Sequence, residues 1–307
     1  MGTANVIPGV SGGTIALIAG IFERLIDAIK NTFSLKSLQL LLKRDFKDLI
    51  NHIDLSFLIS ILIGIAFAII SVAKLLEFLF ANHPTSVWAF FFGLVMASIF
   101  FVGKIISKWN FAVVSIFALG LIIAVLLAFL KPASENDNFI YLLICGAIGI
   151  SSMILPGISG SFVLVLMGNY ELIMIKAVNE LNIVILFPVV LGAGGGLLGM
   201  SYFLSWIYKK YKNQTIAVLS GFISGSLLII WPWKETIFAK DNFGEYILTR
   251  SGEKIVESYS WFFPSNWHLE NIIAVVMIII GVGVIYLTEV YAMKHSMTKK
   301  FRHTRDC

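Results

Sequence analysis

The sequence predicts an all-α polytopic membrane protein that is built as an inverted repeat. Three observations support this prediction: the composition is strongly apolar, several apolar stretches are long enough to cross a bilayer, and one short motif occurs twice. Hydrophobic residues make up 58% of the 307 positions and charged residues only 13%, whereas soluble domains carry about 25% charged residues. This composition places the chain among membrane proteins.

Several apolar stretches can span the hydrocarbon core of a bilayer, which takes about 20 residues of helix. Lipid offers no hydrogen bonds to the backbone, so these stretches should be helices. They do not alternate in the manner of barrel strands. Examples are Leu55–Ala73, Val87–Val102, Phe111–Leu130, Ile183–Ile207, Ile216–Trp231 and Asn271–Leu287.

The motif VIPGVSGGT, which starts at Val6, returns as ILPGISGSF at Ile154. Two shifts align further positions of the two halves. The pairs are Gly20 with Gly168 and Glu23 with Glu171 at a shift of 148 residues, and Gly64 with Gly192, Gly93 with Gly221 and Ser98 with Ser226 at a shift of 128. Agreement at this many positions indicates an internal duplication, as found in many transporters.

The duplication predicts two repeats, each a re-entrant helical hairpin with a PGxSG tip followed by three transmembrane helices. The first repeat covers residues 1–131, with its hairpin at 1–29 and a cytoplasmic loop at 30–54. The second covers residues 139–293, with its hairpin at 139–178 and an extracytoplasmic loop at 234–270, and a basic tail follows at 294–307. The counterpart of the second hairpin's first arm would lie before Met1, so we expect the native chain to start upstream; the alternative is that this protein lacks that arm.

Lysine and arginine residues set the expected orientation. Most of them fall in residues 30–54, 104–110, 209–214 and 294–307, and basic residues mark the cytoplasmic side of a membrane protein. The C-terminus should therefore be cytoplasmic. This orientation requires residues 139–178 to leave and return on the same side of the membrane.

The two motifs suit the binding of a phosphate group. Proline and glycine break a helix and let another backbone approach, and irregular backbone inside a membrane is tolerated where it lines a cavity. A helix that starts after such a turn presents free N–H groups to an anion. Ser11, Thr14, Ser159 and Ser161 add hydroxyl donors. The alternative is that the glycines only let helices pack closely, which applies above all to the stretch 192–199 and to Gly221 and Gly225.

Charged and polar side chains near the motifs are further candidates. Glu23 and Glu171 occupy matched positions and can carry a proton or hold a cation, since a carboxylate inside a membrane is a functional candidate by default. Arg24 can grip a phosphate through two hydrogen bonds, and Asn5 and Asn169 flank the hairpin arms. Alternatively, both glutamates lie at the level of the lipid headgroups, and Arg24 only helps to set the membrane topology.

No cofactor, metal site or catalytic residue is expected. No cluster of His, Cys, Asp and Glu has the spacing of metal ligands, and the two cysteines stand far apart at Cys145 and Cys307. The basic residues are explained by topology, so no nucleic-acid partner is expected. Membrane lipids are the expected surroundings, and the sequence leaves open whether two copies form a homodimer.

The stretch MGTANVIPGVSGGTIALIAGIFERLI, together with the later ILPGISGS, resembles the family of polyprenyl-phosphate transporters (PopT type), formerly a domain of unknown function. The resemblance covers essentially the whole chain. It implies a flippase in a bacterial or archaeal plasma membrane that returns undecaprenyl phosphate to the cytoplasmic leaflet, where the carrier lipid serves cell-wall and peptidoglycan synthesis again. The implied binding residues are Pro8, Gly9, Ser11, Gly12, Gly13, Thr14, Pro156, Gly157, Ser159, Gly160 and Ser161.

Two other functions stay open at this point. An undecaprenyl-pyrophosphate phosphatase is similar in architecture, but its second motif holds an arginine between serines where this chain has Gly160. Phosphoanhydride hydrolysis needs charge neutralisation and an activated nucleophile, and the second motif offers neither an arginine nor a base. A transporter of small inorganic anions would need a continuous polar lining. The sequence therefore favours a lipid transporter that is not an enzyme.

Overall fold

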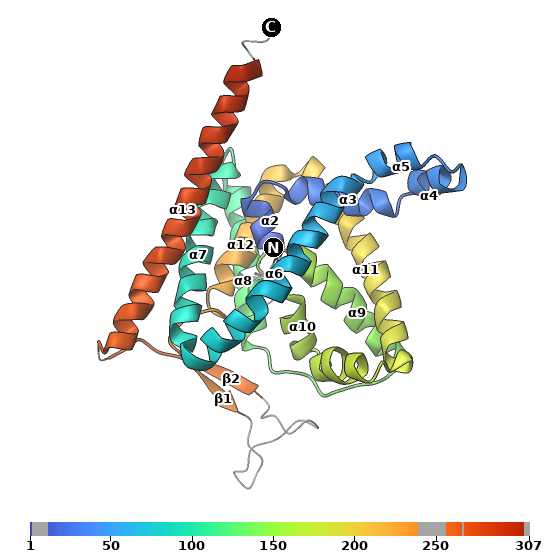
Figure 1. The fold of residues 1–307 in the computed structure, drawn as a ribbon. Coiled ribbons are helices and arrows are strands. Elements are labelled where there is room, and N and C mark those ends of the chain that lie inside the picture. The colour runs from blue at the N-terminus through green and yellow to red at the C-terminus, as the bar shows by residue number, and fades with distance from the viewer. Residues whose placement is uncertain (2–11, 239–255, 266, 304–307) are drawn as a thin grey trace.

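The computed structural model describes residues 1, 12–238, 256–265 and 267–303. Within these ranges the chain is mostly helical and contains one two-stranded antiparallel sheet (Figure 1). The elements are α2 (Gly12–Ile18), α3 (Phe22–Thr32), α4 (Leu35–Leu42), α5 (Phe46–His52), α6 (Leu55–Asn82), α7 (Pro84–Ile105), α8 (Phe111–Phe129), α9 (Phe139–Ile154), α10 (Gly160–Leu166), the π-helix η1 (Glu171–Ala177), α11 (Ile183–Lys210), α12 (Lys212–Ser226), β1 (Lys234–Phe238), β2 (Val256–Trp261) and α13 (Leu269–His303).

Four helices in the described ranges are long and apolar enough to cross a membrane. They are α7, α8, α11 and the part of α13 from Leu269 to Thr288. A fifth span results if α5 and the first half of α6, which meet at a bend of 61°, count as one. Many large apolar side chains of these helices are exposed, as expected where lipid covers the surface. The prediction of a multi-pass helical membrane protein is confirmed.

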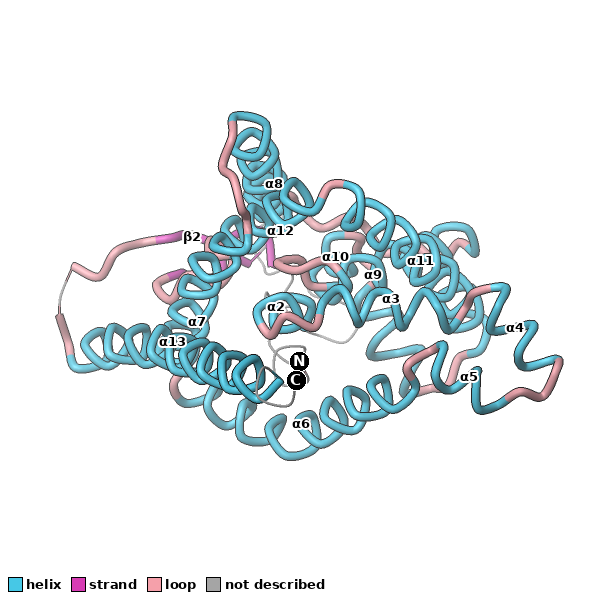
Figure 2. Tube along the Cα trace, turned by 90° about the horizontal axis from the view of Figure 1, so that it is seen from above, coloured by secondary structure: helices cyan, strands magenta, loops and turns pink. Residues whose placement is uncertain are grey.

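The predicted spanning stretch at Ile216–Trp231 is an α-helix only in part, and hydrogen-bonded turns continue it to Ile230. Helix α12 has only 15 residues and ends at Ser226, whereas a span takes about 20. The hydroxyls of Ser220 and Ser224 donate to carbonyl oxygens one turn back, at 2.7 and 2.8 Å, a bond that weakens a helix slightly. Helix α12 is largely buried and contacts both α7 and α8 (Figure 2).

Two segments predicted as loops contain regular structure. Residues 30–54 form α4 and α5, whose first turns are capped by the side chains of Ser34 and Asp45. In the loop 234–270, β1 pairs with β2 so that Lys234 lies opposite Trp261. The protein is therefore not entirely α-helical. These elements are too short to leave a clear periodic pattern in the sequence.

Two helix pairs, α7 with α13 and α8 with α12, meet through glycines. A methyl group at Gly93 would lie 2.1 Å from the carbonyl oxygen of Ile278, and one at Gly221 would lie 2.3 Å from that of Phe117. Only a hydrogen atom fits at such distances, so the backbones are in direct contact. The packing interpretation of Gly221 is confirmed.

Helices α9 and α11 form a third pair of this kind. A methyl group at Gly192 would lie 1.9 Å, and one at Gly196 2.3 Å, from a carbonyl oxygen of α9. Added methyl groups at Gly194, Gly195 and Gly199 would meet no neighbouring atom of the described chain within 4 Å. The packing interpretation of this stretch is thus confirmed for two glycines and wrong for the other three.

Candidate functional site

The second motif forms the turn of a helical hairpin between α9 and α10. The base of the hairpin is closed by two hydrogen bonds, from the Asn136 N–H to Asn169 Oδ1 at 2.9 Å and from Asn169 Nδ2 to the Asn136 carbonyl at 2.7 Å. The chain therefore returns to the place where the hairpin began, and Pro156 and Gly157 lie in the turn between α9 and α10, which neighbour each other in Figure 1. Asn169 closes this base rather than lining a cavity with the motif.

Gly157 is required at this turn for two reasons. Its φ is +86°, a region that side-chain-bearing residues rarely adopt. A methyl group here would also lie 2.5 Å from the backbone nitrogen of Ile223 and 2.5 Å from the carbonyl carbon of Phe222. The turn is thus pressed against the backbone of α12, and Pro156 and Gly157 are both buried.

Thr14 brings the first motif into contact with the second. The Gly157 N–H donates to Thr14 Oγ1 at 3.0 Å, although the two residues stand 143 positions apart. Thr14 is only 2% exposed, and Gly12 and Gly13 beside it, at the start of α2, are also buried. The structure therefore joins the described parts of both motifs in the interior of the protein.

Two serine hydroxyls lie next to this contact. Ser159 Oγ and Ser161 Oγ are 2.7 Å apart and half-buried. Gly160 between them has no room for a side chain, because a methyl group would lie 2.3 Å from Met153 Cγ. Ser159 and Gly157 line a narrow cavity of about 10 Å³ between α8 and α10, about the space that one water molecule needs.

The remaining predicted residues of the first motif, Asn5, Pro8, Gly9 and Ser11, lie outside the described residues.

The two candidate glutamates lie apart from the motif contact. Glu171 stands in η1 beyond the base of the hairpin, where Lys176 Nζ lies 3.4 Å from its carboxylate and 3.7 Å from that of Glu135. Glu23 lies in the first turn of α3 and is exposed. The structure therefore does not gather these carboxylates beside Thr14 and Gly157.

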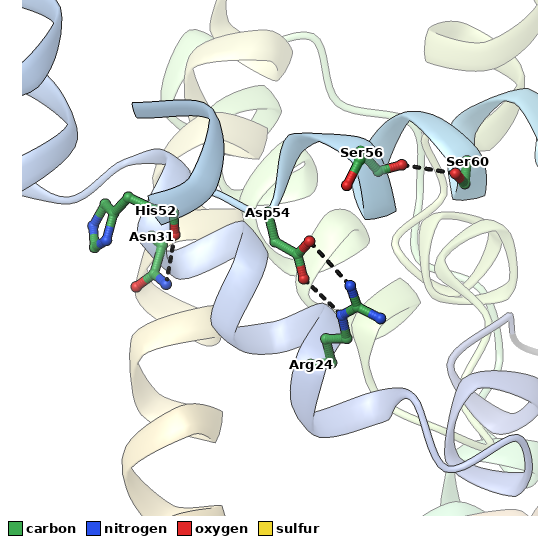
Figure 3. A network of polar contacts seen from close by, with 6 residues as sticks. All are labelled: Arg24, Asn31, His52, Asp54, Ser56 and Ser60. Carbon is green, nitrogen blue, oxygen red and sulfur yellow. Dashed lines mark hydrogen bonds and ion pairs between the residues drawn. The ribbon is translucent and has the colours of Figure 1, made fainter. Parts of the chain in front are cut away.

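Arg24 is engaged by Asp54 at the start of α6 (Figure 3). Arg24 Nε donates to Asp54 Oδ2 at 2.6 Å and Nη2 donates to Oδ1 at 3.0 Å. The guanidinium also lies over the ring of Phe57, 4.2 Å from its centre. The hydrogen bonds from Arg24, reinforced by its charge, lower the pKa of the Asp54 carboxyl. The protein itself thus occupies the donors Nε and Nη2 of Arg24 and both carboxylate oxygens of Asp54.

The sequence reasoning missed a polar group that joins α3 to α11. Asp27 Oδ1 accepts a hydrogen bond from Ser205 Oγ at 2.7 Å, and Oδ2 pairs with Lys209 Nζ at 2.5 Å. Lys30 Nζ donates to the same serine at 3.2 Å. The available signal was the spacing of Glu23, Asp27 and Lys30, which places three charges on one helix face.

Comparison with known families gives the class of this protein. Residues 1–247 match the undecaprenyl phosphate translocase-like family, and the chain belongs to it. A relative from Vibrio cholerae, a polyprenyl-phosphate transporter, is 36% identical over 297 residues, which cover 96% of this chain and 94% of the relative. Another polyprenyl-phosphate transporter, from Staphylococcus aureus, is 32% identical over 250 residues, or 76% of this chain and 83% of the relative. No solved structure matches. The family predicted from the two motifs is confirmed.

Proposed function

We propose that this protein is a transporter that moves undecaprenyl phosphate, or a related polyprenyl phosphate, from the outer to the cytoplasmic leaflet of the plasma membrane. The carrier lipid is thereby returned to cell-envelope synthesis. The observation that supports this function is family membership over residues 1–247, together with relatives that match most of the chain and are themselves transporters. A hydrolytic function is set aside, because the family and both relatives are transporters and not enzymes.

We further propose that the two halves are inverted repeats. The close helix contacts support this arrangement, since they recur at constant shifts. Gly93 and Gly221 are 128 positions apart, and the residues they meet, Ile278 and Phe117, are 161 positions apart. Gly120 and Gly281 are also 161 positions apart. A methyl group at Gly281 would meet the carbonyl oxygen of Phe90, and one at Gly120 would meet that of Val218, and these two partners are again 128 positions apart. Two unrelated halves would not be expected to show the same pair of shifts, 128 and 161, at two separate contacts.

The phosphate group is proposed to bind where the motifs meet. The contact between Thr14 and the Gly157 N–H supports this location, because it places the motif that opens each half at one buried point. A buried phosphate needs hydrogen-bond donors, and the hydroxyls of Ser159 and Ser161 lie within a few residues of that contact. The polyprenyl chain remains in the lipid. Rocking of one repeat against the other then exposes the site alternately to each leaflet.

Proton coupling through Glu23 and Glu171 is part of the proposal. Their matched positions in the two halves motivate it, and an ionisable residue in a membrane segment is a functional candidate. Glu23→Gln and Glu171→Gln should each flatten the pH dependence of transport in proteoliposomes. An unchanged pH profile in both variants removes these residues from the coupling step. The C-terminus is placed on the cytoplasmic side, since the basic loops gather there.

The function is tested with purified protein in proteoliposomes that contain labelled undecaprenyl phosphate. The measurement is the rate at which the headgroup becomes accessible from the other leaflet, with and without a pH gradient. We expect faster crossing than in protein-free vesicles, with the lipid chemically unchanged. Phosphate release from undecaprenyl pyrophosphate in the same vesicles would instead support the phosphatase, and flux of inorganic anions without lipid movement would support the anion transporter.

The site is tested with Ser159→Ala combined with Ser161→Ala. A hydrogen bond to a charged group contributes about 1.5–3 kcal/mol, so the double variant should insert normally and lose most of its transport. The matched control is Ser60→Ala, because the Ser60 hydroxyl donates to the carbonyl of Ser56 on its own helix, away from the motif contact (Figure 3). Full transport by the double variant contradicts the proposed site.

A further inference from the structure

A cavity of about 360 Å³ lies at the end of α7, between α7, α8 and α12. This volume falls within the range of sites that hold small ligands. Its lining is almost entirely apolar, with one cation at the rim. The lining includes Ile99, Phe100, Gly103, Lys104, Trp109 and Ser220. The cavity opens at the protein surface, since Phe100 is 63% and Trp109 49% exposed.

The equivalent place in the other half is filled by two aromatic rings. With the shift of 128, Gly103 corresponds to Trp231 and Ser220 corresponds to Phe92. Trp231 and Phe92 stack edge to face with ring centres 5.2 Å apart. A glycine and a serine therefore replace a tryptophan and a phenylalanine at one end of the molecule only. The cavity is a difference between the halves and not a packing defect that both share.

The end that has the cavity carries the exposed cation Lys104, whereas the ammonium nearest the filled end, Lys234, lies over the ring of Trp88, 4.1 Å from its centre, and donates to the Ile229 carbonyl. Lys104 corresponds to Pro232 at the filled end. Its ammonium lies 4.3 Å from the ring centre of Phe100 and 5.3 Å from that of Phe101, and it is exposed. Within the described residues no carboxylate lies within ion-pair distance of Lys104. An anion can therefore approach this ammonium directly above the apolar cavity.

We infer that this cavity is a second binding site for the transported lipid, with the phosphate on Lys104 and the first isoprene units of the chain among the apolar side chains. The inference rests on the proposed function. One cavity of about 360 Å³ with one cation suits a lipid with a single chain and a monoester phosphate better than a glycerophospholipid with two chains. In the proposed orientation Lys104 lies at the cytoplasmic side, so the site holds the lipid as it leaves the protein.

The site is tested with an undecaprenyl phosphate that carries a photoreactive diazirine in the isoprene unit next to the phosphate. The full-length protein is labelled in vesicles, digested, and the labelled peptides are identified by mass spectrometry. We expect label on the segment 99–117. Gly103→Trp copies the residue that fills the other end, and it should reduce this label at least about tenfold. Lys104→Gln should weaken it about tenfold, the order expected for one charge-assisted contact, while Lys104→Arg retains it.

Matched controls separate the site from general effects of bulk and charge. Gly199→Trp places the same ring on an exposed, open glycine of α11, and Lys108→Gln removes a cation from the loop that follows α7, four residues after Lys104. Both should label like the unaltered protein. Full labelling of 99–117 in Gly103→Trp or Lys104→Gln overturns the inference. Equal protection by phosphatidylglycerol and by unlabelled undecaprenyl phosphate also overturns it, since the site would then select any anionic lipid.

Transport in the same vesicles separates this inference from the proposed function. We expect Gly103→Trp to slow the crossing of undecaprenyl phosphate. If the unaltered protein moves the lipid and Gly103→Trp moves it equally fast with unchanged labelling, the second site is wrong and the transporter stands. If the unaltered protein does not move the lipid at all, the proposed function fails and the inference falls with it.

Discussion

Helices α6 and α11 have the same length of 28 residues and matched glycines at Gly64 and Gly192, yet they are packed in opposite ways. Helix α11 lies along α9 in direct backbone contact, with Gly192 at the crossing. Helix α6 runs along the edge of the molecule (Figure 2) and contacts α3, α5 and α7 only sparsely. A methyl group at Gly64 would meet no atom of the described chain within 4 Å.

The comparison teaches that a glycine in an apolar helix permits close packing but does not produce it. The contact forms only where a second helix arrives at the right height and angle. Helix α6 is held instead at its two ends: Asp54 pairs with Arg24 of α3 (Figure 3), and Leu76, Leu79 and Phe80 pack into the hydrophobic core. The two helices therefore depend on different interactions, and substitutions should separate them.

The largest expected effect comes from the same substitution at the two matched glycines. Gly192→Leu drives a side chain into the carbonyl oxygen of Leu143, which a methyl group would already approach to 1.9 Å. Overpacking costs about 1–3 kcal/mol or more, so little folded protein should be recovered from detergent. Gly64→Leu should melt like the unaltered protein in the same thermal assay. Equal losses in both variants would contradict the packing difference.

A smaller loss is expected where the two motifs meet. Thr14→Val keeps the shape of the side chain but leaves the buried Gly157 N–H without its acceptor. An unpaired buried donor costs about 1–3 kcal/mol, and transport should fall along with the melting temperature. Thr14→Ser retains the hydroxyl and is the control. A Thr14→Val protein with unchanged stability would mean that the contact is not a structural link between the halves.

The next effect concerns the two sides of α3, which faces α11 through Asp27 and α6 through Arg24. Asp27→Asn weakens the pair with Lys209, whose side chain is 51% exposed. Partly exposed ion pairs contribute about 0–1 kcal/mol. A double-mutant cycle with Lys209→Gln should therefore give a small coupling free energy for unfolding. Ser205→Ala should weaken that coupling further, since its hydroxyl donates to the same carboxylate. A coupling of zero would mean that the Asp27–Lys209 pair does not help to hold α3 against α11.

The smallest effect is a pH dependence at the start of α6. Arg24 lowers the pKa of Asp54 in the folded protein, so the pair stabilises the fold above the ordinary carboxyl pKa of about 3.9. That contribution is lost as the pH falls through the lowered pKa, because the unfolded chain takes up the proton first. The difference in melting temperature between the unaltered protein and Asp54→Asn should be present at pH 7 and vanish in acid. A difference in melting temperature that stays constant with pH would mean that the Asp54 carboxylate is not its cause.

Several features of the fold and site follow from the sequence alone. Long apolar runs predicted α7, α8, α11 and the spanning part of α13 within a few residues, since lipid imposes helix on any such run. The two PGxSG motifs identified the family and the turn at Pro156 and Gly157, because proline and glycine leave few backbone alternatives. The shifts of 128 and 148 were readable before any contact was known.

Other features required the tertiary structure. Nothing in the sequence distinguishes Gly64 from Gly192, or Gly196 from Gly199, since each is a glycine in an apolar helix and only the position of a partner helix separates them. The length of α12 depended on burial between α7 and α8, which frees its serines from lipid. The pairs Arg24 with Asp54 and Asp27 with Lys209 join residues 30 and 182 positions apart.

The sequence by itself determined that this chain is a helical membrane protein in which one motif occurs twice, and it named the family. Those properties are set by local chemistry: the cost of exposing peptide groups to lipid, and the restricted backbone of proline and glycine. Tertiary structure decided that Thr14 and Gly157 touch, which glycines are in contact, and that a cavity lies beside Lys104. These are properties of distance between segments, and distance depends on how all helices pack together.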